Sequence, residues 1–171
     1  MTSPNNKKGI IVSVLAIALV LGGLIWFSRG SGRNNRQENL NSSGGGKLSA
    51  EESTFDFGTV SMSAGKVSHT FKIKNDGTEL AIITKLYTSC MCTSAELMVG
   101  GKRLGPFGMP GHGFIPSINQ TVNAGESAEI LVTFDPAAHG PAGVGPTNRT
   151  VYIEQKSGAE MRLEISTIVT P

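Results

Sequence analysis

The two cysteines of the chain, Cys90 and Cys92, are separated by a single residue, and two further soft ligands follow within about twenty residues. These are Met109 and His112, which flank a Pro-Gly pair, so that a turn there could direct the thioether and the imidazole toward one point. Thiolate, thioether and imidazole together favour Cu(I), whereas two thiolates with His112 and His139 would suit Zn(II). The sequence therefore predicts a metal site at Cys90, Cys92, Met109 and His112, with Cu(I) ahead of Zn(II).

Two other interpretations of the cysteine pair stay open. Both thiols could be small core side chains, because free cysteine is among the most buried residue types. They could also form a disulfide or a redox dithiol, as expected of an exported domain with an even number of cysteines. In an extended strand the two Cα atoms would be about 6.6 Å apart, near the upper limit for a disulfide. A bridge would therefore require a sharp turn at Met91, and a redox pair would also require a nearby base or helix terminus to lower a thiol pKa.

Catalysis finds little support in the sequence. There is no nucleophile elbow, no phosphate-binding loop and no pair of carboxylates that flanks a plausible cleft. The three histidines are scattered: His69 alternates with Val67 and Phe71 as a strand residue would, and His139 is expected to be a loop residue. We therefore expect a protein without enzymatic activity.

The charge distribution argues against a nucleic-acid partner. Residues 47–171 contain ten basic and twelve acidic side chains, so the mildly basic balance of the whole chain comes from residues 1–46. Binding to nucleic acid would require a basic face on the folded part. The sequence offers none.

An apolar segment precedes the folded part. Residues 10–27 (IIVSVLAIALVLGGLIWF) carry no charge and would span about 27 Å as a helix, just enough to cross a bilayer core. A cleaved signal peptide is the competing interpretation, but no small-x-small cleavage site follows. We expect a short tail at residues 1–9, a single-pass transmembrane anchor at residues 10–27 and a flexible Gly/Ser/Asn-rich linker at residues 28–50. The domain behind them, residues 51–171, is expected to be extracytoplasmic at the cell membrane.

The sequence of the domain that must position the cysteines predicts an all-β fold. Apolar residues alternate with polar ones at residues 67–74 and 128–134, and a hairpin is predicted at the carboxyl end, with its turn at Ser157-Gly158. Residues 80–88 are predicted to be a strand with Leu80, Ile82 and Leu86 on one face, whereas residues 105–116 and 135–147 contain too much Gly and Pro for regular strands. Seven or eight short strands at this spacing predict an antiparallel β-sandwich.

Several motifs resemble a known family in their combined order. They are FDFGTV, HTFKIKNDGTEL, the Cys-x-Cys pair and NAGESAEILVTFDP, and together they extend over about residues 53–168. They resemble the bacterial immunoglobulin-like domains of unknown function that are related to the Hydin-type family. The resemblance implies an immunoglobulin-like sandwich, often exported, with no established enzymatic activity. This chain departs from the pattern in Met91, where glycine is common, and in the long insertion GPFGMPGHGFIP.

The sequence thus predicts a membrane-anchored, extracytoplasmic, non-catalytic immunoglobulin-like domain that binds a soft metal ion. One alternative is a protein–protein interaction or structural module with buried cysteines, and a second is a thiol redox module. The expected partners are the membrane through residues 10–27 and a metal ion or another exported protein. No other cofactor is expected.

Overall fold

The computed structural model describes residues 46–171, and this part of the chain folds into ten strands and two 3-10 helices. The predicted tail, the predicted anchor and most of the predicted linker lie outside the described residues. Within residues 46–171 there is no helix of the length and apolarity needed to cross a bilayer. The elements are β1 (Leu48–Ala50), β2 (Thr54–Ser61), η1 (Met62–Ala64), β3 (Val67–Asn75), β4 (Ala81–Thr88), β5 (Thr93–Val99), β6 (Lys102–Phe107), β7 (Gln120–Val122), β8 (Ser127–Phe134), η2 (Gly140–Gly143), β9 (Gly145–Gln155) and β10 (Glu160–Thr170).

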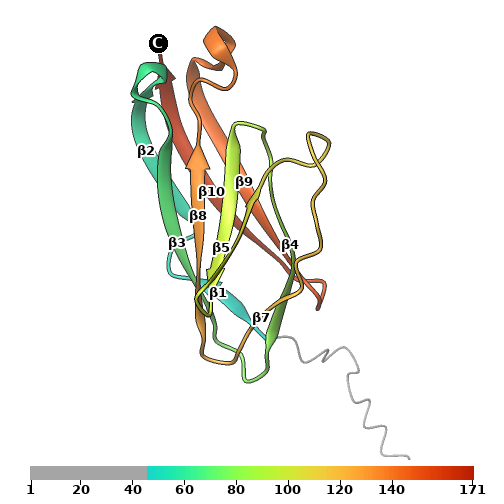
Figure 1. Ribbon diagram of the computed structural model, residues 1–171. Coiled ribbons are helices and arrows are strands. Elements are labelled where there is room, and N and C mark those ends of the chain that lie inside the picture. Colours follow the sequence, from blue (N-terminus) through green and yellow to red (C-terminus); the bar gives the residue numbers. More distant parts are fainter. Residues whose placement is uncertain (1–45) are drawn as a thin grey trace, which may run out of the picture. The chain divides into compact units, whose positions relative to one another are not determined.

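The strands form two five-stranded sheets, with the orders β1-β3-β8-β5-β6 and β2-β10-β9-β4-β7 (Figure 1). The predicted all-β sandwich is confirmed. One strand pair differs from the antiparallel expectation, because β2 runs parallel to β10. The reason is that β2 does not pair with β3 as a hairpin: the chain passes through η1 to the other sheet, which leaves β2 beside the last strand.

The core lies between the two sheets, and period-two alternation predicted much of it. In β8 every second residue is buried, from Ala128 to Phe134, and in β3 Phe71 and Ile73 are buried in the same way. The two strands of the carboxyl-terminal hairpin, β9 and β10, contribute five more buried apolar side chains, namely Val151, Ile153, Leu163, Ile165 and Val169. Alternation was informative here because each strand has one face in the core and one in solvent.

For the first half of β4, the sequence predicted the wrong side chains to face the core. Ala81 and Ile83 are buried, whereas Leu80 is 48% exposed. The pairing of β4 with β9 shifts register between Ile83 and Lys85, and an inserted residue of this kind moves the following side chains to the opposite face. After the shift Leu86 is buried, as predicted.

Two boundaries also differ from the sequence-based expectation. The sandwich begins before residue 51, because β1 lies within the predicted linker and pairs with β3, and Leu48 packs against the core. The two apolar side chains of this three-residue strand, Leu48 and Ala50, are too few to give a periodic signal in a Gly/Ser-rich segment. Similarly, β6 extends to Phe107, inside the segment expected to be irregular, and buries the Phe107 ring.

Candidate functional site

The cysteines lie in a tight turn between β4 and β5, not in a continued strand. The N–H of Thr93 donates to the carbonyl of Cys90 at 3.1 Å, which closes the turn at residues 90–93. The buried hydroxyl of Thr88 lies beneath it, 3.0 Å from the carbonyl oxygen of Cys90 and 2.9 Å from that of Thr93. The turn at Met91 that a sulfur–sulfur contact would require is therefore present.

Hydrogen bonds attach this turn to both sheets. The N–H of Ser89 donates to the carbonyl of Thr150 at 2.9 Å, and the Thr150 N–H donates back to the Ser89 hydroxyl at 2.9 Å. On the other side the N–H of Asp135 donates to the carbonyl of Cys92 at 2.8 Å. The connection from β4 to β5 and the loop from β8 to β9 consequently lie at the same end of the sandwich, the upper end in Figure 1.

A histidine from the β8–β9 loop completes a cluster with the cysteines. The two sulfurs are 2.6 Å apart, and Cys90 Sγ lies 3.1 Å from His139 Nε2. All three potential ligand atoms lie within 4.8 Å of one another. Cys92 is 2% exposed, Cys90 is half-buried and His139 is exposed, so the cluster extends from the core to the surface.

The loop that carries His139 is held by local hydrogen bonds and by glycines. The carboxylate of Asp135 accepts from the N–H of Ala137 at 3.0 Å, and Gly140 has a positive φ of 54° directly after His139. A Cβ added at Gly143 would lie 3.1 Å from the Cβ of His139, so glycine gives the histidine its space. These are turn signals in the sequence, but they do not indicate which strand connection the loop contacts.

Arg149 is a site residue that sequence reasoning missed. Its Nε donates to Cys92 Sγ at 3.0 Å, and its Nη1 donates to the carbonyl of Asn148 at 2.7 Å. A signal was present, because Arg149 has the same parity as the buried residues Val151 and Ile153 in β9. A charged residue on the inward face of a strand is unusual unless it has a partner.

The surrounding groups shift the pKa values of the two thiols in opposite directions. Burial opposes ionisation of Cys90, but hydrogen bonds from the thiol and N–H of Cys92, the His139 ring and the charge of Arg149 lower its pKa from 9.0 to about 7. Burial raises the pKa of Cys92, as does its hydrogen bond to Cys90, while Arg149 acts in the opposite direction. The half-buried sulfur, Cys90, is therefore the one that ionises more readily.

The other two predicted ligands lie in a separate turn. The N–H of His112 donates to the carbonyl of Met109 at 3.3 Å, with Met109 half-buried and His112 exposed. This loop starts next to the cysteine turn, because the Gly108 carbonyl accepts from the N–H of Thr88 at 3.0 Å. Among residues 46–171, however, the histidine that clusters with the cysteines is His139 and not His112. Proximity in sequence favoured His112, whereas the pairing of β5 with β8 brings residue 139 close.

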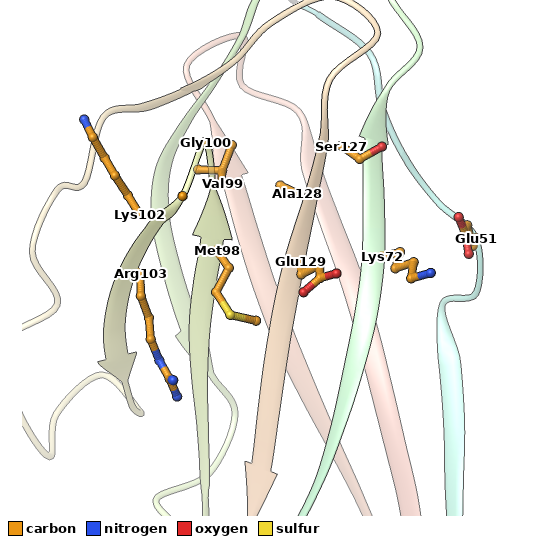
Figure 2. A pocket seen from close by; sticks show the side chains of 11 residues that line it. Glu51, Lys72, Met98, Val99, Gly100, Lys102, Arg103, Ser127, Ala128 and Glu129 are labelled. Atoms are coloured by element: carbon orange, nitrogen blue, oxygen red, sulfur yellow. The ribbon is translucent and has the colours of Figure 1, made fainter.

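Away from the cysteine cluster, a surface hollow lies on the outer face of the sheet β1-β3-β8-β5-β6, near the turn between β5 and β6. It has a volume of about 530 Å³ and contains no cysteine or histidine among its lining residues. Figure 2 shows side chains from adjacent strands along it, among them Lys72, Glu129, Met98 and Arg103. Register places Glu129 between Lys72 and Met98, and Met98 beside Arg103. Such a row of mixed charge is typical of a solvated sheet face, so this hollow is not a strong candidate site.

Fold and site together define a β-sandwich domain with a Cys/His/Arg cluster at one end. Residues 48–99, which include both cysteines but neither His139 nor Arg149, match the profile of a family described as protein of unknown function (DUF1573). No curated protein sequence matches the chain. The relationship to the Hydin-type family stays a prediction.

Two solved structures illustrate the structural similarity. A protein of unknown function from Porphyromonas gingivalis W83 has a TM-score of 0.53 and 12% identity, over 72% of this chain and 46% of that chain. This chain thus spans about half the length of that relative. The ASH/PapD-like domain 7 of human CEP192 has a TM-score of 0.44 and 14% identity, over 74% of this chain and 87% of that chain. At such identity the first similarity shows the fold alone.

Proposed function

We propose that this domain binds one soft metal ion through Cys90 Sγ, Cys92 Sγ and His139 Nε2, with Cu(I) ahead of Zn(II). The observation that carries the proposal is that these three ligand atoms, from two separate loops, lie within 4.8 Å of one another. Two thiolates and an imidazole are a donor set that binds Cu(I) and Zn(II). No catalytic step is part of this function.

An incoming ion must separate the sulfurs. Metal–sulfur bonds of about 2.3 Å place two sulfurs of one ion roughly 3.8 Å apart at a tetrahedral angle, whereas Cys90 Sγ and Cys92 Sγ are 2.6 Å apart. Cys92 is buried and its sulfur is contacted by Arg149 and Thr93. The half-buried Cys90 and the exposed His139 are therefore the groups that adjust, and the ion enters from their side.

Arg149 favours a monovalent ion. Two thiolates with Cu(I) carry a net charge of −1, which the guanidinium beside Cys92 compensates. The same ligands with Zn(II) are neutral, so Arg149 would add an uncompensated positive charge. Zn(II) also takes four ligands in structural sites, and the cluster in the described residues provides three.

In the proposed setting the domain is tethered to the cell membrane by a single-pass anchor at residues 10–27 and lies on the extracytoplasmic side. The apolar run and the Gly/Ser-rich segment after it support this arrangement. The immunoglobulin-like assignment and the tether together suggest a partner, namely another exported protein that delivers or accepts the ion by ligand exchange at Cys90.

The test is an anaerobic Cu(I) titration of the reduced full chain in mild detergent against a competing chelator. We expect one-to-one binding that is lost in the double variant Cys90→Ser, Cys92→Ser. His139→Gln should weaken binding by more than about tenfold, because one direct ligand is removed. The matched controls, His112→Gln and Met109→Leu, should bind like the unmodified chain.

Two results would contradict the proposal. Absence of Cu(I) binding above background in the reduced chain would exclude the site altogether. A loss of affinity in His112→Gln, with unchanged affinity in His139→Gln, would instead favour the ligand set predicted from sequence.

A further inference from the structure

The sulfurs of Cys90 and Cys92 are closer to each other than two ligands of one metal ion would be. Their separation of 2.6 Å is only about 0.5 Å longer than a disulfide bond of roughly 2.05 Å. The turn closed by Thr93 N–H and the Cys90 carbonyl produces this approach. The geometric objection to a bridge, which assumed an extended strand, therefore does not apply.

We propose that Cys90 and Cys92 also form a reversible intramolecular disulfide by thiol–disulfide exchange, in which Cys90 is the attacking sulfur and Cys92 the resolving sulfur. The substrate class is a disulfide, of a small molecule or of an exported protein. This activity uses two of the ligands of the proposed metal site but does not depend on metal binding.

Exposure assigns the two roles. Cys90 is half-buried next to the exposed His139, whereas Cys92 is 2% exposed and lies behind Cys90. A disulfide that approaches from solvent therefore meets Cys90 first. Cys92 can reach only the sulfur of Cys90, which is what a resolving thiol requires.

The reaction balances in two exchanges. First, the Cys90 thiolate attacks one sulfur of R–S–S–R, a Cys90–S–S–R bond forms, and RS⁻ leaves and takes up the proton released by Cys90. Second, the Cys92 thiolate attacks Cys90 Sγ, the intramolecular disulfide forms, and the second RS⁻ leaves with the proton released by Cys92. The protein dithiol loses two electrons and two protons, and the substrate disulfide becomes two thiols.

Two neighbouring side chains are positioned to assist these steps. His139 Nε2, 3.1 Å from Cys90 Sγ, can hold the proton that Cys90 gives up in the first exchange. Arg149 Nε, 3.0 Å from Cys92 Sγ, can stabilise the thiolate that attacks in the second. Both are positioning residues, since the sulfurs alone form and break bonds.

The test uses the full chain, reduced and freed of metal, and equilibrated with glutathione and glutathione disulfide at a series of ratios. Free thiols are then alkylated, and the intact mass reports dithiol, glutathione adduct and intramolecular disulfide. We expect both thiols of the unmodified chain to disappear together, without a stable adduct. We also compare the proportion of glutathione disulfide at which half of the chain is oxidised. This proportion should be at least about tenfold lower for the folded chain than for the same chain unfolded in urea, because the turn pre-positions the sulfurs.

Single variants test the assignment of roles. Cys92→Ser should accumulate the glutathione adduct on Cys90, and Cys90→Ser should react more than about tenfold more slowly, because Cys92 is buried. Equal adduct rates in the two variants would overturn the roles, and a folded chain no easier to oxidise than the unfolded one would overturn the proposal. Oxidation without Cu(I) binding by the reduced chain would instead refute only the metal function, and normal Cu(I) binding without oxidation would refute only this inference.

Discussion

At the scale of single residues, the position of Arg149 explains why a buried thiol and a more ionisable one can lie side by side. Its Nε donates to the sulfur of Cys92, whose side chain is almost fully enclosed. Its positive charge also lowers the pKa of Cys90, two residues before Cys92 in the same turn. The guanidinium thus compensates negative charge on either sulfur, whether the charge arises by ionisation, by metal binding or during exchange.

The ionisation of Cys90 gives the first prediction. Because only the thiolate reacts with iodoacetamide, the alkylation rate of Cys90 in the reduced, metal-free chain should rise with pH and reach half of its maximum near pH 7. Below this pH the sulfur is protonated and unreactive. The rate is measured by mass spectrometry of the peptide that contains Cys90. A midpoint near the ordinary thiol value of 9.0 would contradict the arrangement of donors around this sulfur.

Replacement of Arg149 gives the second prediction. In Arg149→Met the alkylation midpoint of Cys90 should move to higher pH, and Cu(I) affinity should fall by about tenfold, as is typical when a group that supports a metal ligand is lost. Zn(II) affinity should fall less, because its complex with these ligands carries no net charge.

Arg162→Met is the matched control for this prediction. Arg162 lies over the ring of Tyr152, with its guanidinium carbon 5.5 Å from the ring centroid, and pairs with Glu160. Its removal should leave both the midpoint and the metal affinities unchanged. Equal losses of Cu(I) and Zn(II) affinity in Arg149→Met would mean that Arg149 does not select by charge.

At the scale of elements, the cysteine turn depends on the end of β4. Thr88 is fully buried, and its hydroxyl lies within hydrogen-bonding distance of two turn carbonyls, those of Cys90 and Thr93. The register shift between Ile83 and Lys85 precedes it in the same strand. Without that shift, the side chains after it would have the opposite parity and Thr88 would not point inward.

The third prediction follows from this support. Thr88→Val keeps the shape of the side chain but removes the hydroxyl, and it should lower the free energy of unfolding by about 1–3 kcal/mol, because the turn carbonyls lose a buried hydroxyl donor. Chemical denaturation of the purified chain measures the change. The control Thr59→Val, at an exposed position of β2, should change it by less than about 0.5 kcal/mol. Equal effects in the two variants would show that the turn does not depend on Thr88.

The sequence predicted some strands well and others poorly, and β4 is again the point of difference. The strands with one solvated face, such as β8, followed from period-two alternation of residues 128–134. β4 was also predicted as a strand, but the buried face of its first half was not, because residues 81–83 are all apolar and the register shift has no marker in the sequence. β1 was missed because a three-residue strand is too short to show a period.

At the scale of the whole sandwich, the candidate site is an outcome of topology. Pairing of β5 with β8 brings the loop after β8 to the cysteine turn, and the position of β9 next to β4 brings Arg149 to the same place. The chain therefore assembles residues 90–92, 139 and 149 only when both sheets are complete. The cysteine pair could be predicted from the sequence because its members are neighbours. His139 could be named only as one of two candidate Zn(II) ligands, and the position of Arg149 beside the cysteines could not be predicted, because both proximities depend on which strands pair.

The central claim is that Cys90, Cys92 and His139 hold one metal ion. X-ray absorption at the copper edge of the Cu(I)-loaded full chain tests this claim most directly. We predict a first shell of two sulfurs at about 2.3 Å and one nitrogen at about 2.0 Å, with the nitrogen lost in His139→Gln and retained in His112→Gln. A shell with a third sulfur, or a nitrogen that persists in His139→Gln and disappears in His112→Gln, would contradict the account.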